Sequence, residues 1–180
     1  MSRRLNIKIC TKQEELQDAI KVRESAFVEE YGYSKEELVL YPLDNQALQI
    51  LATDYSGTPV GSCRFTPLPQ DLDNLPPSST LNPQTENSAR ELFKDSQGGR
   101  FWWLAVSPAG RGRGVAGGLI KYCEEYTAEM VRKHSSTAYM RIRANYKAHK
   151  MYLRFGYVVD SEKFLLAGQE LIWMKKTWKV

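Results

Sequence analysis

The spacing of apolar residues changes along the chain from alternation to helical periodicity and back. Residues 5–10 alternate between apolar and polar, which predicts a first strand. From Leu16 to Phe27 the apolar residues recur three or four positions apart, which predicts an amphipathic helix, and Thr11-x-x-Glu14 before it has the form of a capping box. Arg23 falls on the apolar side of this helix, where a charged residue is unusual.

The middle and end of the chain favour strands, with helices between some of them. Residues 101–106 form an aromatic and aliphatic run between Gly98-Gly99 and Ser107-Pro108, which predicts a buried strand. Helical spacing then returns from Val115 to Met130. The remaining expected elements are a hairpin over 47–54 and 59–66, a strand over 137–143, a helix over 145–155, and a final hairpin over 157–164 and 169–177. The pattern predicts a mixed sheet with flanking helices.

Residues 67–99 form the least regular part of the chain. They contain five prolines and many Ser, Asn, Asp and Gln residues, and they are longer than an ordinary connection. We expect one short helix there, near residues 88–93. The segment has two interpretations, a surface loop or a lid over the acceptor side of a site. Its several leucines and Phe93 favour the lid, because a purely solvated loop would not need them.

Composition limits the class of protein. The chain has 180 residues, of which 42% are hydrophobic, so residues 1–180 are expected to form a single domain with one core. No apolar run approaches the length of a membrane span, and the Met-Ser-Arg-Arg start does not resemble a secretory signal. We therefore expect a location in the cytoplasm or the nucleus and no membrane partner.

Charge and cysteine usage narrow the possible ligands. The formal net charge is +4, with basic residues scattered among acidic ones, which favours an anionic ligand over nucleic acid. Cys10, Cys63 and Cys123 are widely spaced on apolar positions and are expected to be reduced core residues. No metal-ligand spacing involves them or the two histidines, so no metal site is expected.

The turn after residues 101–106 is rich in glycine and leads directly into a helix. The first backbone N–H groups of a helix lack internal partners and carry partial positive charge. Gly112 and Gly114 would let a phosphate approach this turn without meeting a Cβ atom. Strand, glycine turn and helix together predict a binding site for a phosphorylated ligand.

Gly112-x-Gly114-x-x-Gly117 also matches the dinucleotide fingerprint. A dinucleotide site needs an acidic residue about 20 positions further on, at the end of the next strand. Here that strand ends at Asn145 without a carboxylate, and the first half of the chain does not alternate as βαβ units. An oxidoreductase that binds NADP therefore remains only an alternative.

The sequence Arg111-x-x-Gly114-x-Ala116, preceded by Leu-Ala-Val-Ser-Pro, resembles the acetyl-CoA signature of the GNAT superfamily of N-acyltransferases. Residues 144–157 resemble the downstream motif of the same family, a small helix with a tyrosine before a Lys/Arg-Phe-Gly-Phe/Tyr ending. Segments at 22–30, 43–44, 59–64 and 164–175 also resemble one branch of the superfamily whose substrates are mostly uncharacterised. The resemblance implies an α/β (α+β) fold, the GNAT fold, with a mostly antiparallel twisted sheet of about six to seven strands.

The resemblance also implies roles for individual residues. In the family, backbone amides of the glycine turn hold the CoA pyrophosphate, and the preceding strand holds the pantetheine arm. Tyr152 matches the tyrosine that acts as general acid, a suitable role because a phenol is protonated at neutral pH. Asn145 is a favoured N-cap of the downstream helix and a further contact to CoA. The expected CoA-binding positions are Leu104, Val106, Arg111, Gly112, Arg113, Gly114, Val115, Ala116, Gly117, Asn145 and Tyr152.

The acceptor side is less defined. Relatives carry a carboxylate base just before the Leu-Ala-Val triplet, where this chain has Trp102 and Trp103. Glu29, Glu30 and Asp44 are the other candidates for a base, and a water chain is an alternative to all of them. Because neighbouring residues of a strand point to opposite faces, one tryptophan is expected to line the acceptor pocket, which we assign to Glu30, Trp102 and Trp103.

The sequence therefore predicts an enzyme that transfers an acetyl group from acetyl-CoA to a primary amine of a small molecule or a protein by direct attack on the thioester. An acetyl-CoA-binding regulatory module without turnover is the main alternative, since it would share the glycine turn but not need Tyr152. The acceptor amine is not identified, and the protein is expected to be a monomer or a homodimer.

Overall fold

The computed structural model describes residues 5–34, 47–68, 85–166 and 168–180. The helices are α1 (Gln13–Arg23), the π-helix η1 (Glu24–Val28), α3 (Glu86–Phe93), the short 3₁₀ helix η3 (Pro108–Gly110), α4 (Val115–Val131), the 3₁₀ helix η4 (Tyr146–Ala148) and α5 (His149–Leu153). The strands are β1 (Asn6–Ile9), β2 (Leu48–Thr53), β3 (Pro59–Leu68), β4 (Gly98–Val106), β5 (Thr137–Asn145), β6 (Val158–Val159), β7 (Phe164–Leu166) and β8 (Gln169–Lys179).

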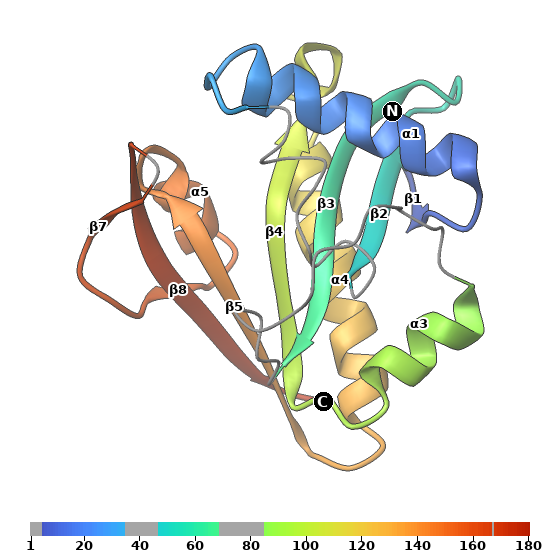
Figure 1. Ribbon diagram of the computed structural model, residues 1–180. Coiled ribbons are helices and arrows are strands. Elements are labelled where there is room, and N and C mark those ends of the chain that lie inside the picture. Colours follow the sequence, from blue (N-terminus) through green and yellow to red (C-terminus); the bar gives the residue numbers. More distant parts are fainter. Residues whose placement is uncertain (1–4, 35–46, 69–84, 167) are drawn as a thin grey trace.

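The strands form one mixed sheet in the order β1-β2-β3-β4-β5-β8-β6, and β7 pairs with β8 off this path. Every neighbouring pair is antiparallel except β4 and β5, which are parallel. The β4–β5 register covers only Gly98–Phe101 and Tyr139–Ile142. Beyond it the two strands diverge, as Figure 1 shows. This separation divides the upper part of the sheet into two wings, a larger one of β1, β2, β3 and β4 and a smaller one of β5, β6, β7 and β8. The observed strand directions confirm the predicted mixed, mostly antiparallel sheet.

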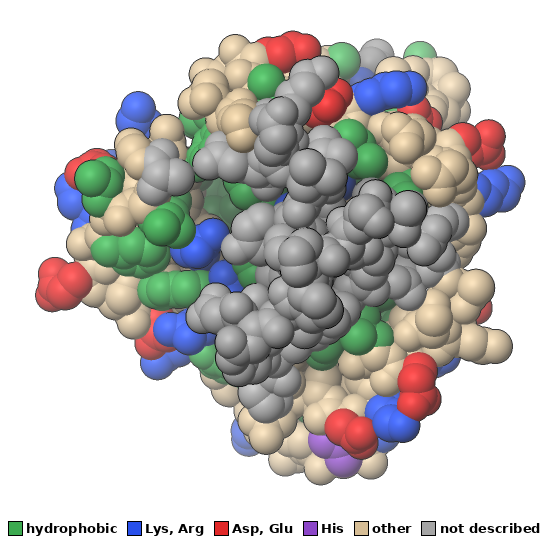
Figure 2. All heavy atoms as spheres, viewed as in Figure 1, with side chains coloured by type: hydrophobic (Ala, Val, Ile, Leu, Met, Phe, Trp, Pro, Cys, Tyr) green, Lys and Arg blue, Asp and Glu red, His purple; other side chains and the backbone are tan. Residues whose placement is uncertain are grey.

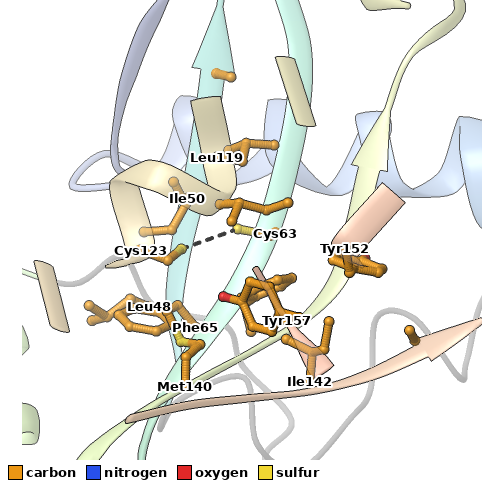
Figure 3. Close-up of a cluster of buried hydrophobic side chains, with 14 of the residues drawn as sticks. Leu48, Ile50, Cys63, Phe65, Leu119, Cys123, Met140, Ile142, Tyr152 and Tyr157 are labelled. Atoms are coloured by element: carbon orange, nitrogen blue, oxygen red, sulfur yellow. Dashed lines mark hydrogen bonds between the residues drawn. The ribbon is translucent and has the colours of Figure 1, made fainter. Parts of the chain in front are cut away.

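Helices cover both faces of the larger wing (Figure 1). The apolar side of α4 packs on one face, with Leu119, Cys123 and Met130 fully buried in the main core. Figure 3 shows this cluster, in which the Sγ atoms of Cys63 and Cys123 lie 3.8 Å apart. All three cysteines are buried and free, as the sequence predicted.

Helix α1 packs on the opposite face of the sheet and begins one residue later than the capping box predicted. Glu15, rather than Glu14, accepts hydrogen bonds from the N–H groups of Thr11 and Lys12. Its carboxylate also pairs with Lys8 of β1, because Glu15 is the residue that faces the strand. The buried Arg23 donates to the Gln49 side chain of β2 at 2.5 Å, which explains a charged residue on the apolar side of this helix.

The described ends of the segment 67–99 form regular secondary structure. Strand β3 extends into it to Leu68, α3 covers the expected short helix, and β4 begins at Gly98. Phe93 is fully buried and stacks on Phe65 with 4.8 Å between ring centroids. The end of the segment therefore belongs to the core beside α4, whereas residues 69–84, which carry most of the predicted lid, lie outside the described residues.

The C-terminal part departs from the sequence prediction in length and type. The expected helix over 145–155 is a 3₁₀ turn followed by the short α5. The expected strand over 157–164 is reduced to β6 and β7, each of which pairs with the long β8. No helix in the described part of the chain is long and apolar enough to cross a membrane.

Candidate active site

A β-bulge in β4 lies where this strand leaves β5. Ser62 and Arg64 of β3 pair with Ala105 and Trp102, so two residues of β4 stand opposite one of β3. Trp103 has a φ of 48°, which a bulky side chain adopts only when the surroundings impose it. The bulge increases the local twist and turns the upper half of β4 away from β5.

A cavity of about 510 Å³ occupies the gap between the separated strands. Its walls come from β4, β5, the π-helix η1, the turn before α4, α5, β7 and β8. Eight predicted site residues line it, namely Trp102, Trp103, Leu104, Val106, Arg111, Ala116, Asn145 and Tyr152. The volume falls within the range of small-molecule sites in proteins. The part of β4 beyond its last pair with β5 therefore lines a cavity.

The glycine turn has the geometry that the sequence predicted. Gly112 and Gly114 have φ values of 69° and 78°, and a Cβ atom built on either would meet no atom within 4 Å. Both glycines thus adopt a left-handed conformation in front of open space. Gly114 is the N-cap of α4, so the turn presents the unpaired N–H groups of the helix to that space.

Two other predicted positions of this helix face inward. The side chain of Val115 is buried in the main core. A Cβ atom on Gly117 would lie 2.9 Å from the Phe155 ring, so this glycine permits close packing of α4 against the segment after α5. Val115 and Gly117 can therefore contact a ligand only through their backbone N–H groups.

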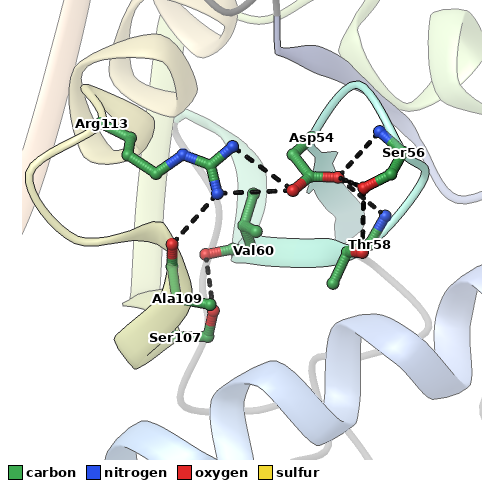
Figure 4. Close-up of polar contacts among 7 residues, drawn as sticks. All are labelled: Asp54, Ser56, Thr58, Val60, Ser107, Ala109 and Arg113. Atoms are coloured by element: carbon green, nitrogen blue, oxygen red, sulfur yellow. Dashed lines mark hydrogen bonds and ion pairs between the residues drawn. The ribbon is translucent and has the colours of Figure 1, made fainter.

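The two arginines of the turn both pair with carboxylates. Arg113 contacts Asp54 of the β2–β3 turn at 3.3 Å and donates to the Ala109 carbonyl (Figure 4). Ser56 and Thr58 hold the same Asp54 carboxylate, and together with Arg113 they lower its pKa. Arg111 pairs with Glu30. In this arrangement Arg113 braces the glycine turn against the hairpin, and Arg111 lines the cavity with its charge compensated.

Tyr152 lies on α5 at the inner wall of the cavity. Its side chain is 8% exposed, and its ring lies 5.9 Å from Phe101 and 6.1 Å from Tyr157. Burial raises the pKa of the Tyr152 phenol well above its usual value, because the ionised form would lose its hydration. The phenol therefore stays protonated at neutral pH, as a general acid requires.

The two tryptophans share one face of the sheet, contrary to the predicted alternation. Trp102 is the cross-strand partner of Arg64, and the Trp103 ring lies 5.9 Å from the same guanidinium. Trp103 also packs edge-on against Phe27 at 4.8 Å, so it points toward η1 on the α1 side. The bulge causes the difference, since an extra residue interrupts the alternation of side chains. As a result both tryptophans, rather than one, line the cavity.

Glu29 and Glu30, two of the carboxylates considered as bases, are not among the residues that line the cavity. Glu29 and Glu30 are exposed at the end of η1, and Glu30 is paired with Arg111. Asp44 lies outside the described residues. Asn145 lines the cavity and caps the next turn, where its Oδ1 accepts from the Lys147 N–H at 3.0 Å. No Asp or Glu of the described ranges borders the cavity.

Several lining residues escaped the sequence analysis. Tyr31 and Tyr33 follow η1 and, together with Phe27, form an aromatic wall of the cavity. Arg143 and Met151 contribute from β5 and α5. The pair of tyrosines around Gly32 was a signal, because aromatic residues in a polar turn need a surface to pack on. Arg143 gave no signal of its own.

The site fits an acyl-CoA in two respects. The N-terminus of α4 and the open space at Gly112 and Gly114 suit a pyrophosphate. The edge of β4 that has left β5 offers backbone groups to an amide-containing arm such as pantetheine. The described strands contain one parallel βαβ unit, β4-α4-β5, and are otherwise antiparallel, whereas a dinucleotide-binding domain is built from repeated parallel units.

Comparisons with solved structures show the same fold. An acyl-CoA N-acyltransferase from Pseudomonas aeruginosa has a TM-score of 0.62 at 18% identity, covering 97% of this chain and 99% of that one. A GCN5-related N-acetyltransferase from Kribbella flavida has a TM-score of 0.59 at 18% identity, covering 96% of each chain. The ribosomal-protein-S18-alanine N-acetyltransferase from Escherichia coli has a TM-score of 0.57 at 12% identity, covering 96% of this chain and 92% of that one.

A search of curated proteins gave no match. The family model for the GNAT acetyltransferases matches residues 16–157, which span the strands on both sides of the gap, the glycine turn and Tyr152. Fold, site and sequence match agree, and the chain belongs to the acetyltransferase (GNAT) family.

Proposed function

We propose that the protein transfers the acetyl group of acetyl-CoA to a primary amine by direct attack of the amine on the thioester. The observation that carries this proposal is the convergence of three features on one cavity. These are the edge of β4 beyond its last pair with β5, the N-terminus of α4 and the buried phenol of Tyr152.

The backbone supplies most of the contacts to acetyl-CoA in this proposal. The N–H groups from Gly112 to Gly117 hold the pyrophosphate, because they begin a helix and point to open space. Leu104 and Val106 offer their backbone groups to the pantetheine arm, while their side chains pack toward the core. Asn145 adds a polar contact across the gap. Arg113 supports this cradle through Asp54.

Acetyl-CoA supplies an activated acyl group. The amine nitrogen forms a bond to the acetyl carbon, and the bond between that carbon and the CoA sulfur breaks. Tyr152 donates its proton to the departing sulfur, which leaves as a thiol. In this proposal the amine loses its proton to water, since the described cavity lining contains no Asp or Glu and Asp44 lies outside the described residues. Tyr152 then regains a proton from solvent. The rate is therefore expected to rise with pH until the amine is fully neutral.

Turnover separates the enzyme from a module that only binds acetyl-CoA. The test incubates the protein with acetyl-CoA and a panel of amines and peptides, and follows release of the free CoA thiol. Release that depends on the amine supports the proposal, and binding without release against the whole panel contradicts it.

Thermal shifts with acetyl-CoA and with NADPH separate acyl transfer from the oxidoreductase alternative. A ligand that binds only the folded state raises the midpoint by mass action. We expect acetyl-CoA to raise the unfolding midpoint and NADPH to leave it unchanged. The reverse result would favour the dinucleotide site.

A further inference from the structure

We propose that Arg143 binds a carboxylate on the acceptor, so that the substrates are amines that carry an acidic group and an apolar body, such as aromatic amino acids. This inference rests on the proposed function, which it refines. It starts from the position of Arg143, the first residue of β5 beyond the last pair with β4, which is Phe101 with Ile142. The side chain therefore stands at the base of the gap and lines the cavity.

Arg143 lies on the side of the sheet opposite α4. Its neighbours Ile142 and Ala144 are buried in the core with α4, so alternation along β5 points Arg143 to the other face. Trp102 and Trp103 lie on that same face. The N-terminus of α4 thus serves the CoA phosphates from one side, which leaves Arg143 for a group that enters from the other.

The charge of Arg143 is not compensated within the described residues. The other arginine of the cavity, Arg111, is paired with Glu30. Beside Arg143, Asp160 already contacts both Arg141 at 3.5 Å and Lys175 at 2.6 Å. No carboxylate of the described part pairs with Arg143, whose guanidinium lies 5.9 Å from the centre of the Trp173 ring. The base of the gap therefore has a positive charge available for an anion.

Aromatic side chains set the rest of the acceptor's chemistry. Phe27, Trp103 and Tyr33 pack edge to face at 4.8 and 5.3 Å beside the same cavity. Figure 2 shows this face, with Lys and Arg side chains next to hydrophobic ones on the wing that contains β5 and β8. An apolar body suits the aromatic wall, and a planar carboxylate matches the fork of a guanidinium.

The test compares acceptors that differ only in the carboxylate. We would measure kcat/KM for L-phenylalanine and L-phenylalaninamide, and for L-tryptophan and tryptamine, with acetyl-CoA at saturation. An Arg–carboxylate contact predicts a preference for the acid of roughly 10- to 100-fold, expressed mainly in KM. Each kcat/KM value must be divided by the fraction of neutral amine at the assay pH, because the amino groups of the acid and the amide differ in pKa.

Variants assign the preference to Arg143. Arg143→Gln should reduce the ratio of acid to amide to about one, Arg143→Lys should keep part of it, and Arg143→Glu should invert it. The matched control is Arg132→Gln, which removes an exposed arginine at the end of α4 and should keep the wild-type ratio. Circular dichroism and the unfolding midpoint check that each variant is folded.

A binding measurement keeps the inference separate from the proposed function. Calorimetry of L-phenylalanine and its amide with the wild type, in the presence of CoA, tests recognition without turnover. If the wild type binds the acid more tightly than the amide and Arg143→Gln does not, the inference is supported. This holds even if no amine is acetylated, a result that would contradict only the proposed function. Turnover with equal use of acid and amide overturns the inference alone. Weaker acetyl-CoA binding by Arg143→Gln with an unchanged ratio would also overturn it, because the guanidinium would then serve the cofactor.

Discussion

Between Gly98 and Phe101, strand β4 pairs with β3 on one side and with β5 on the other. From Trp102 to Val106 it keeps β3 and loses β5. The lower half is part of the core, and the upper half borders a cavity of about 510 Å³. Two halves of one strand, nine residues long, therefore have different roles.

We call Gly98–Phe101 the closed half of β4 and Trp102–Val106 its open half. Packing explains why the closed half lies directly against β5. A Cβ atom on Gly98 would overlap the carbonyl of Tyr139 in β5, and one on Gly99 would overlap the Phe65 ring and lie 2.7 Å from the Thr127 hydroxyl. These glycines let β5 and the core approach the strand as closely as they do. The open half has large side chains and a bulge, which keep β5 at a distance.

The comparison shows how a sheet can provide a binding site without a separate domain. Unpaired strand edges are usually covered, because their backbone groups seek partners. Here the edge opens inside the molecule, where a ligand with amide groups can complete it. The predictions below test this division of β4, from the largest expected effect to the smallest.

Gly98→Ala should damage the closed half most. The new methyl group has no space beside the Tyr139 carbonyl, so β4 and β5 must move apart. We expect a loss of about 3 kcal/mol in the free energy of unfolding, at the upper end for overpacking. Urea unfolding followed by circular dichroism measures it. Gly118→Ala of α4 is the control, since its Cβ would meet only the movable side-chain ends of Ile7 and Leu5, and an equal loss there would refute the steric explanation.

Gly114→Asp should act on the open half without unfolding the protein. The substitution places a negative charge in the open space at the N-terminus of α4. Repulsion of the pyrophosphate should weaken acetyl-CoA binding on the order of 100-fold, measured by calorimetry. Gly168→Asp adds the same charge at a similar left-handed φ, 73° instead of 78°, in the turn between β7 and β8 on the other side of the gap. Comparable affinity in both variants would exclude the proposed phosphate site.

Tyr152→Phe should lower turnover and leave binding nearly intact. The ring keeps its contacts with Phe101 and Tyr157, but the proton donor is lost. We expect kcat to fall on the order of 100-fold with little change in the Kd for acetyl-CoA. The raised pKa of Tyr152 means that the donor form persists above pH 10, so the wild type should not lose activity near pH 10 through this group. Wild-type kcat in the variant would reassign the acid to water or another residue.

Tyr126→Phe removes a hydroxyl beside the closed half and should have the smallest effect. Its ring packs on Phe65 and Phe93, and burial raises its pKa from 10.0 to about 12. The unfolded chain ionises this phenol first, so its contribution to stability is complete below pH 10 and is lost as the pH rises to 12. Because the group is only about half buried, the change should stay below about 1 kcal/mol.

Urea midpoints of the wild type and Tyr126→Phe at pH 8 and pH 11 measure this contribution. The variant should lose less stability than the wild type between these values, with unchanged kcat at pH 8. A large fall in kcat would mean that the two halves of β4 are coupled rather than separate.

Local patterns were sufficient to predict much of the protein. The helical spacing from Val115 onward, the glycines before it and the buried run before them placed β4, the turn and α4 in order. The positive φ of Gly112 and Gly114 follows from what those residues alone tolerate. The position of Tyr152 on a short helix after β5 came from the resemblance and is in agreement with the structure.

Other features depended on contacts between distant parts of the chain. The bulge that puts both tryptophans on one face requires the registers of β4 with β3 and β5, and no local alternation reveals it. Arg113 and Asp54 are 59 positions apart, and their pairing follows from the proximity of the turn to the hairpin. Arg141 and Arg143 both alternate with apolar residues in the sequence, and only the end of the β4–β5 pairing at Ile142 places Arg143 at the gap. The sequence by itself determined most of the elements and the glycine turn before α4, because a few adjacent residues fix backbone conformation. Only the tertiary structure decided where the strands separate and which side chains face the cavity, because this depends on packing across the whole sheet.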